Sequence, residues 1–318
     1  MASLPESMTR WLEHLSKTVR YSAHTLQGYT RDLAKLAEFA GGTPPEQLGA
    51  AQLRQYLARL HGQGMSPRSL ARTLSAWRGF FKWWAPQAGM PANPTDGLRA
   101  PKAPRSLPKA LSVEQAMGLL DHAGARQGHD ALARRDHAMF ELFYSSGLRL
   151  SELTSLDVSY RRVPGYESRG WINLAESEVL VLGKGGKRRA VPVGKAAAQA
   201  IERWLAERPA LLAPGAGEDD AAALFLGARG RRIAPRVVQA QLARLAVSAG
   251  LPAHVHPHVL RHSFASHVLQ SAQDLRAVQD MLGHANISTT QIYTRLDFQH
   301  LARAYDQAHP RAARKREG

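Results

Sequence analysis

The sequence contains no cysteine in its 318 residues. That absence excludes disulfide bonds, zinc sites built on thiolates and catalysis by a cysteine nucleophile. Apolar runs are also short: none reaches the roughly 18 residues that a membrane-spanning helix needs, so we expect no insertion into a membrane. The first residues lack the basic segment followed by an apolar segment that is typical of a secretory signal. We therefore expect a cytoplasmic protein.

Acidic residues are few compared with basic ones. There are 26 Asp and Glu against 42 Lys and Arg, which gives a formal net charge of +16 at pH 7. An excess of this size indicates a polyanionic partner, most often nucleic acid, although charge alone also allows a basic enzyme without such a partner. The hydrophobic fraction of 44% is typical of globular chains, and the length predicts about two domains.

Helical patterning dominates residues 1–93, which we predict to form an N-terminal helical domain. Ser22 is a suitable N-cap for a helix whose apolar residues recur every three or four positions as far as Phe39. A second amphipathic stretch covers residues 48–60. Ser66, which is followed by a proline, predicts the start of a third helix, because serine caps helices and their first turn tolerates proline.

A basic, proline-rich segment over residues 94–110 is predicted to link two domains. Its prolines exclude a helix, and no acidic residue lies between Gly97 and Ser112. Two basic domains joined in this way could close around a DNA duplex. The third helix also has a basic side, which could instead be a solvated face opposite a core. The residues that we expect to contact DNA are Arg68, Arg72, Arg99, Lys102, Arg105, Lys187 and Arg188.

The second domain is predicted to span residues 111–318 and to combine helices with a small antiparallel sheet. Ser112 and Gln115 fit a capping box at its start. Two runs rich in β-branched residues flank a glycine-rich turn, which predicts a β-hairpin over residues 179–193. Residues 213–220 have the composition of a surface loop. Helices are predicted at residues 131–145, 149–156, 195–207, 234–249, 258–270, 274–281 and 297–306.

Two clusters in this domain carry side chains that are suited to catalysis. In the first, Gly147 ends one helix, Arg149 opens the next, and Glu152 follows three residues later, where it can orient the arginine. An ordinary surface ion pair would produce the same pattern. In the second cluster, His258 and Arg261 share one face of a helix, which is also compatible with a plain solvated helix.

Neighbouring histidines raise a metal site as an alternative for the second cluster. His254, His256 and His258 alternate along the chain, but Pro257 interrupts the series and no Asp, Glu or Cys lies among them. The usual zinc ligand sets draw on those residue types as well as histidine. We therefore expect neither a metal nor another cofactor.

A third cluster contains His284 and Tyr293, nine positions apart. A lone tyrosine on a helix is ordinarily a packing residue. The order of all these motifs, however, resembles that of the tyrosine recombinase (phage integrase) family. The motifs that carry the resemblance are Arg149, the hairpin Lys184, His258 with Arg261, Gly283 with His284, and Tyr293.

The resemblance covers nearly the whole chain. The segment Ser22-Ala23-His24-Thr25-Leu26 is similar to the family's N-terminal core-binding domain, and residues 144–153 and 291–301 resemble the bacterial recombinases that resolve chromosome dimers. The implied fold is mainly α, with a SAM-like helical core-binding domain and an α+β catalytic domain. Two departures are Val259, where many members have Thr, and residues 161–170, which look inserted before the hairpin.

The resemblance also implies a role for each motif residue. Arg149 and Arg261 match the two catalytic arginines, Lys184 the hairpin lysine, and Tyr293 the nucleophile that forms a 3′-phosphotyrosine with DNA. Lys187 is the rival for the lysine role, because the insertion weakens the alignment around the hairpin. The two histidine positions are matched by His258 and His284.

General chemistry agrees with these roles. Two guanidinium groups can bind the nonbridging oxygens of a phosphodiester, where negative charge develops during attack. A tyrosine of pKa about 10 needs that positive field and a base, for which His258 is suited. Lys184 can protonate the leaving 5′-oxygen and His284 can hydrogen-bond the phosphate. Because the phosphotyrosine conserves the bond energy, rejoining needs no ATP.

The resemblance implies a site-specific recombinase acting on double-stranded DNA. The implied partner is a sister recombinase within a heterotetramer on DNA, and a DNA translocase could activate the complex. The apolar stripe over residues 296–305 predicts a C-terminal helix that docks on a neighbouring protomer, or else on its own domain. Alternatives are the sister recombinase itself, a mobile-element integrase, a type IB topoisomerase or a non-catalytic DNA-binding architectural protein.

Overall fold

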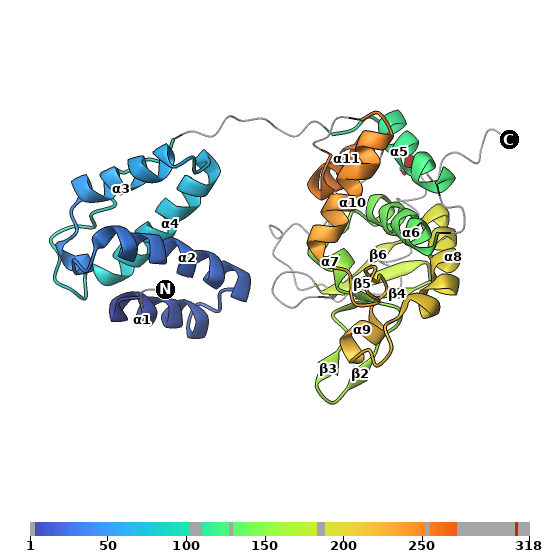
Figure 1. Cartoon of the computed structure of the whole chain (residues 1–318), viewed down its shortest axis with the longest axis horizontal. Helices are drawn as coiled ribbons and strands as arrows, with labels where there is room; N and C mark the ends of the chain where they lie inside the picture. The colour runs from blue at the N-terminus through green and yellow to red at the C-terminus, as the bar shows by residue number, and fades with distance from the viewer. Residues whose placement is uncertain are drawn as a thin grey trace. The chain divides into compact units, whose positions relative to one another are not determined.

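The computed structural model describes residues 4–101, 110–126, 130–182, 188–251, 255–271 and 309–310. The chain divides into two compact units, residues 1–107 and 108–318 (Figure 1). No helix in the described ranges is long and apolar enough to cross a lipid bilayer.

The N-terminal unit is a bundle of helices whose starts agree with the predicted caps. Ser22 accepts a hydrogen bond from the backbone N–H of Thr25 at 3.2 Å, and Ser66 accepts one from Ser69 at 3.3 Å. Gly41 ends the first of these helices with φ 56°, a left-handed conformation that glycine adopts without strain. The helices are α1 (Glu6–Lys17), α2 (Ala23–Ala40), the 3₁₀ helix η1 (Pro45–Gln47), α3 (Ala50–Gly62) and α4 (Pro67–Trp84).

The core of this unit is built on α4. Trp77, Phe80 and Phe81 are fully buried there, at helical spacing, and Trp11 of α1 packs edge-on against Phe80. Leu98 is also buried in this core, and its carbonyl accepts a hydrogen bond from Arg78 at 2.9 Å. The first residues of the predicted linker therefore pack against the N-terminal unit.

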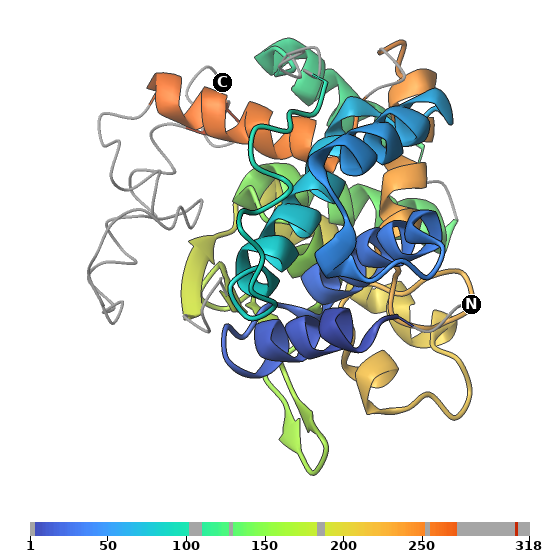
Figure 2. The same ribbon diagram turned by 90° about the vertical axis from the view of Figure 1, so that its left-hand side faces the viewer.

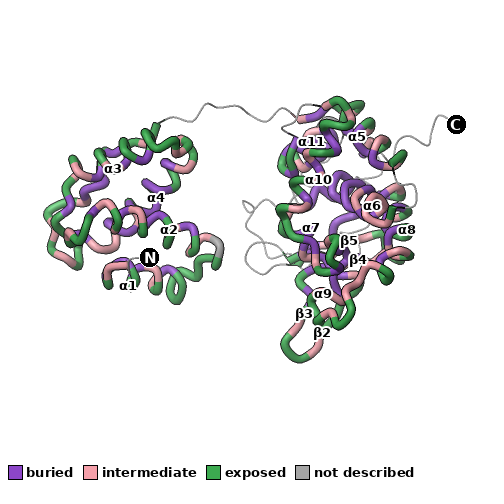
Figure 3. Tube along the Cα trace, viewed as in Figure 1, coloured by how far each residue is buried: buried purple, intermediate pink, exposed green. Residues whose placement is uncertain are grey.

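The second unit places a four-stranded sheet beside a group of helices. Its first helix, α5 (Val113–Ala125), has the predicted capping box, in which Ser112 and Gln115 bond each other's backbone N–H. Helix α6 (Ala131–Ser146) is buried along its second half and is packed extensively against α8, so it forms the centre of the core (Figure 3). The other helices are α7 (Leu150–Thr154), α8 (Lys195–Leu211), α9 (Glu218–Ala222), α10 (Pro235–Ser248) and α11 (Pro257–Ser271).

The sheet confirms the predicted hairpin. Strands β5 and β6 are antiparallel with Val179 opposite Val191, and both side chains are buried. The strand order is β1-β4-β5-β6, in which only the β1–β4 pair is parallel among the described strands. The strands are β1 (Leu156–Asp157), β4 (Gly170–Asn173), β5 (Glu178–Leu182) and β6 (Arg188–Pro192).

The insertion forms a separate ribbon. Strands β2 (Arg162–Val163) and β3 (Tyr166–Glu167) pair with each other and extend from the rest of the unit in both views (Figures 1 and 2). The Tyr166 hydroxyl donates to Asp157 at 2.7 Å, and Arg232 also binds that carboxylate at 2.7 Å. These contacts attach the ribbon to β1.

Three predicted boundaries were wrong. The helix predicted to end at Leu156 ends at Thr154, because Leu156 pairs with Gly170 in the sheet. The loop predicted over residues 213–220 gives way to α9 at Glu218, where three acidic residues favour a helix N-terminus. Helix α8 continues four residues beyond its predicted end, to Leu211. The helices predicted at residues 274–281 and 297–306 lie outside the described residues.

Candidate active site

The corner between α6 and α7 is pressed against α11. Gly147 ends α6 with φ 54°, and a Cβ at this position would collide with the ring of Phe264 on α11. Glycine is therefore required here both for its backbone conformation and for the close approach. Because Arg149 follows two residues later, the same corner places its side chain near α11.

Arg261 joins α11 to that corner. Its guanidinium donates a hydrogen bond to the carbonyl of Gly147, the residue that ends α6. Arg261 is half-buried, whereas His258, one turn earlier on α11, is exposed. The structure thus brings together the turn that carries Arg149 and the helix that carries His258 and Arg261.

Glu152 orients Arg149, and its carboxylate has a second partner. The Oε1 atom accepts a bond from Nη1 of Arg149 at 2.9 Å, while Oε2 accepts one from the Arg149 backbone N–H at 2.8 Å. Arg189 of β6 binds the same two oxygens from the other side, each at 2.9 Å. A surface ion pair is thereby excluded, since Glu152 is only 7% exposed.

Positive charge dominates this cluster. Arg149, Arg189 and Arg261 carry three charges against the single charge of Glu152, so these four residues sum to 3 − 1 = +2. Burial lowers the pKa of Arg261 to about 10, and the neighbouring Arg149 contributes to the shift. Burial would raise the pKa of Glu152, but hydrogen bonds and charge from Arg189 and Arg149 outweigh it and leave that pKa below its usual value. The cluster is suited to bind an anion.

Several predicted site residues lie outside the described residues. They include the predicted nucleophile Tyr293 and the predicted proton donor Lys184, so the structure does not test their roles. In the described ranges, no group of three or more His, Asp or Glu side chains could hold a metal ion. The other predicted site residues outside the described ranges are Lys102, Arg105, Lys187 and His284.

The predicted DNA contacts that the structure describes fall into two groups. Arg68 and Arg99 are exposed. Arg72 instead reaches the buried carboxylate of Asp32 on α2, with an Nη1–Oδ2 distance of 2.5 Å. Its side chain remains 44% exposed, so a structural role is certain and a contact with DNA stays a prediction.

Arg188 also has protein partners. It pairs with Glu167 of the β2–β3 ribbon at 3.0 Å and lies over the rings of Tyr160 and Trp171. A phosphate would have to compete with Glu167 for this guanidinium. This ion pair could not be predicted from local sequence, because the two residues lie on separate hairpins.

Sequence reasoning missed Arg189, which binds both carboxylate oxygens of Glu152 with its side chain. The available signal was alternation: in β6, Arg189 falls on the same face as the buried Val191, so it points inward. An inward arginine needs hydrogen-bond acceptors, and Glu152 is the acidic residue of the neighbouring motif.

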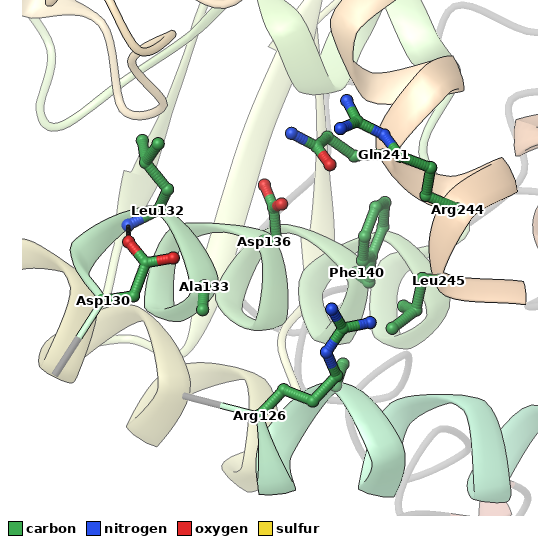
Figure 4. A pocket seen from close by; sticks show the side chains of 10 residues that line it. Arg126, Asp130, Leu132, Ala133, Asp136, Phe140, Gln241, Arg244 and Leu245 are labelled. Carbon is green, nitrogen blue, oxygen red and sulfur yellow. Dashed lines mark hydrogen bonds between the residues drawn. The ribbon is translucent and has the colours of Figure 1, made fainter. Parts of the chain in front are cut away.

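A pocket of about 310 Å³ lies elsewhere, between α5, α6 and α10 (Figure 4). Arg126, Asp136 and Arg244 line it together with Phe140. Burial raises the pKa of Asp136, although Arg135 opposes the shift. None of the predicted site residues lines this pocket, so the arginine cluster does not belong to it.

The chain matches two family models. Residues 109–300 match the phage integrase family, and residues 8–87 match the phage integrase N-terminal SAM-like domain. Tyrosine recombinase XerC 1 of Ralstonia nicotianae is 55% identical over 310 residues, which cover 96% of this chain and 93% of that protein. A tyrosine recombinase XerC of Pseudomonas aeruginosa is 52% identical, covering 96% of this chain and 95% of that protein.

Solved structures have the same fold. The Tn1549 transposon integrase in complex with circular intermediate DNA has a TM-score of 0.67 at 20% identity, covering 97% of each chain. The XerH site-specific recombinase bound to palindromic difH substrate has a TM-score of 0.64 at 23% identity, covering 93% of this chain and 83% of that one.

Proposed function

The chain belongs to the phage integrase family of tyrosine recombinases, which are DNA strand transferases, and we propose that it acts as a XerC recombinase. In this role it cleaves and rejoins double-stranded DNA at a recombination site and resolves chromosome dimers at cell division. The observation that carries the proposal is that Arg149 and Arg261 meet at one corner of the fold. Arg261 donates a hydrogen bond to Gly147 there, and Glu152 orients Arg149.

The chemistry that we propose is transesterification. The Tyr293 oxygen attacks the scissile phosphorus, the bond from phosphorus to the 5′-oxygen breaks, and a 3′-phosphotyrosine forms. His258 takes the phenol proton, and Lys184 delivers a proton to the leaving 5′-oxygen. Rejoining reverses these steps with the 5′-hydroxyl of the partner strand, so that no water and no nucleotide is consumed.

The arginine cluster supplies the electrostatic part of this reaction. The net charge of Arg149, Arg261, Arg189 and Glu152 is positive before DNA arrives, so the cluster attracts the negative charge that develops on the phosphate. Bidentate guanidinium groups match the geometry of two nonbridging oxygens. His258 is exposed on the same helix as Arg261, where an incoming strand can reach it.

The partners that we propose are those that the family resemblance implies. A sister recombinase of the XerD type would occupy the other arm of the site, two of each forming a heterotetramer, and a DNA translocase would activate it. The XerH site-specific recombinase binds a palindromic difH substrate, which supports a DNA recombination site as the substrate class here.

A nicked two-arm substrate tests the proposal. The protein is incubated with the chromosomal dif-type site of its own genome, with and without the sister recombinase, and covalent adducts are separated by denaturing electrophoresis. We expect an adduct on one strand and cooperative occupancy of both arms with the sister protein. Cooperative occupancy without any adduct would favour an architectural DNA-binding protein instead.

A further inference from the structure

Strand β6 carries two adjacent arginines in opposite environments. The side chain of Arg188 is 48% exposed, whereas that of Arg189 is 6% exposed. Removing a guanidinium from water is unfavourable unless strong hydrogen bonds replace its hydration. Arg189 obtains those bonds from Glu152, which it grips with both terminal nitrogens at 2.9 Å.

Glu152 connects Arg189 to Arg149. Its Oε1 serves Nη1 of both arginines, and its Oε2 serves Nη2 of Arg189 and the backbone N–H of Arg149. The orientation of the carboxylate is therefore fixed from the β6 side. Because the same two oxygens hold the side chain and the backbone of Arg149, the position of that arginine depends on Arg189.

Arg189 also links the sheet to the start of α7. In the register of the sheet, Val181 of β5 pairs with Arg189 of β6. The two hydrogen bonds from Arg189 to Glu152 therefore attach β6 to the helix whose N-cap is Arg149.

Charge sharing gives Arg189 a second effect. With both arginines present, Glu152 divides its charge between two cations, which leaves positive potential on Arg149 for a phosphate. Without Arg189, the carboxylate would neutralise Arg149 alone and would compete with the incoming phosphate. The orientation of Arg149 and its remaining positive charge both favour binding of the phosphate.

We propose that Arg189 is a positioning residue of the DNA-cleavage reaction, which holds Glu152 so that Arg149 faces the scissile phosphate. The inference rests on the proposed recombinase function. It concerns a residue that does not itself touch DNA, so its loss should weaken cleavage far more than binding.

A double-mutant cycle with Glu152 tests the coupling. Single-turnover cleavage of the nicked substrate is measured for Arg189→Gln, Glu152→Gln and the double variant, with DNA affinity measured in parallel. We expect Arg189→Gln to slow cleavage by about 10- to 100-fold, the scale of a misplaced catalytic group, while affinity changes by less than about threefold. In the Glu152→Gln background, Arg189→Gln should slow cleavage by no more than about threefold.

Arg208→Gln is the matched control for lost stability. Arg208 is also a buried arginine, 8% exposed, but its hydrogen bonds go to backbone carbonyls, among them those of Ala221 and Ala223, and not to the Glu152 carboxylate. Its substitution should lower the melting temperature without slowing cleavage by the folded protein. Arg189→Lys keeps the charge but cannot make the bidentate hydrogen bond to the carboxylate, so it should recover part of the cleavage rate.

The outcomes separate the two proposals. If the two substitutions lower the cleavage rate by factors that multiply in the double variant, or if Arg189→Gln cleaves at the wild-type rate, the positioning role is wrong. A wild-type protein that forms no adduct would overturn the recombinase function instead. The coupling then remains testable by a ¹³C titration of the Glu152 carboxyl, whose pKa should rise in Arg189→Gln, and an unchanged pKa would refute the coupling.

Discussion

The hydroxyl of Tyr144 on α6 lies 2.8 Å from Nδ1 of His267 on α11. The other ring nitrogen of His267 lies 2.8 Å from the carbonyl of Leu111, which lies two residues before the start of α5. Because a carbonyl accepts, Nε2 carries the proton and Nδ1 accepts from Tyr144. His267 therefore ties the helix that carries Arg261 to both α6 and the start of the second unit.

The first prediction concerns pH. Burial lowers the pKa of His267, although its bond to Leu111 opposes the shift. The unfolded chain then binds more protons than the folded one, so stability falls as pH drops below the ordinary histidine pKa of about 6.5. Denaturant titrations at about pH 7.5 and about pH 5.5, which bracket that pKa, should give a smaller difference for His267→Phe than for wild type.

His267→Phe should also lose about 1–3 kcal/mol at the higher pH, because Tyr144 and Leu111 lose a buried partner. The exposed His61 on α3 provides the control: His61→Gln should preserve the wild-type dependence on pH. An unaltered pH dependence in His267→Phe would mean that other groups produce it.

Gly147→Ala should damage both stability and cleavage. The left-handed backbone alone costs about 1–3 kcal/mol for a residue other than glycine. The added methyl group must also displace Phe264, and with it α11 and Arg261. Gly41→Ala is the matched control, since Gly41 ends α2 with φ 56° and has open space around its Cβ position. Equal effects from both substitutions would remove the close approach to Phe264 as an explanation.

Arg72 and Arg68 should separate stability from DNA binding. Arg72→Ala leaves the Asp32 carboxylate buried with fewer partners, so we expect the N-terminal unit to lose about 1–3 kcal/mol. Arg68 is exposed on the same helix, and Arg68→Ala should lower DNA affinity with little change in unfolding. The checks are unfolding curves and binding isotherms over a range of salt concentrations. If Arg72→Ala unfolds like wild type, its ion pair with Asp32 contributes nothing measurable.

Lys184→Ala should slow cleavage of ordinary DNA and recover on a 5′-phosphorothiolate substrate. Sulfur leaves without a proton, so the substrate bypasses a general acid that contributes about 10²- to 10⁴-fold. Lys187→Ala is the natural comparison, because it removes the same charge from the same turn. Rescue of Lys187→Ala alone would transfer the role of acid to that lysine.

Local signals predicted most of the fold. The caps at Ser22, Ser66 and Ser112 and the alternation around the hairpin depend on neighbouring residues, and the structure confirms each of them. The ends of α7 and α8 were missed because pairing and packing with distant segments set them. The hydrogen bond from Arg261 to Gly147 was not predicted, since it links residues 114 positions apart.

The partners of the basic residues could not be predicted. Glu152 was expected to meet Arg149 because three residues separate them on a helix, but Arg189 reaches it across 37 positions. Arg72 and Asp32 are similarly separated by 40 positions, on different helices. A charge count shows how many basic residues are present, whereas only the fold decides which of them bind carboxylates.

Our central proposal is that Tyr293 forms a covalent 3′-phosphotyrosine at the site that contains Arg149 and Arg261. It is tested most directly by trapping the adduct on a nicked substrate, digesting it with protease and nuclease, and locating the attached nucleotide by mass spectrometry. We predict a nucleotide on the peptide that contains Tyr293, and no adduct from Tyr293→Phe even though that variant still binds the DNA. A nucleotide on a different residue, or an adduct that persists in Tyr293→Phe, would contradict the claim.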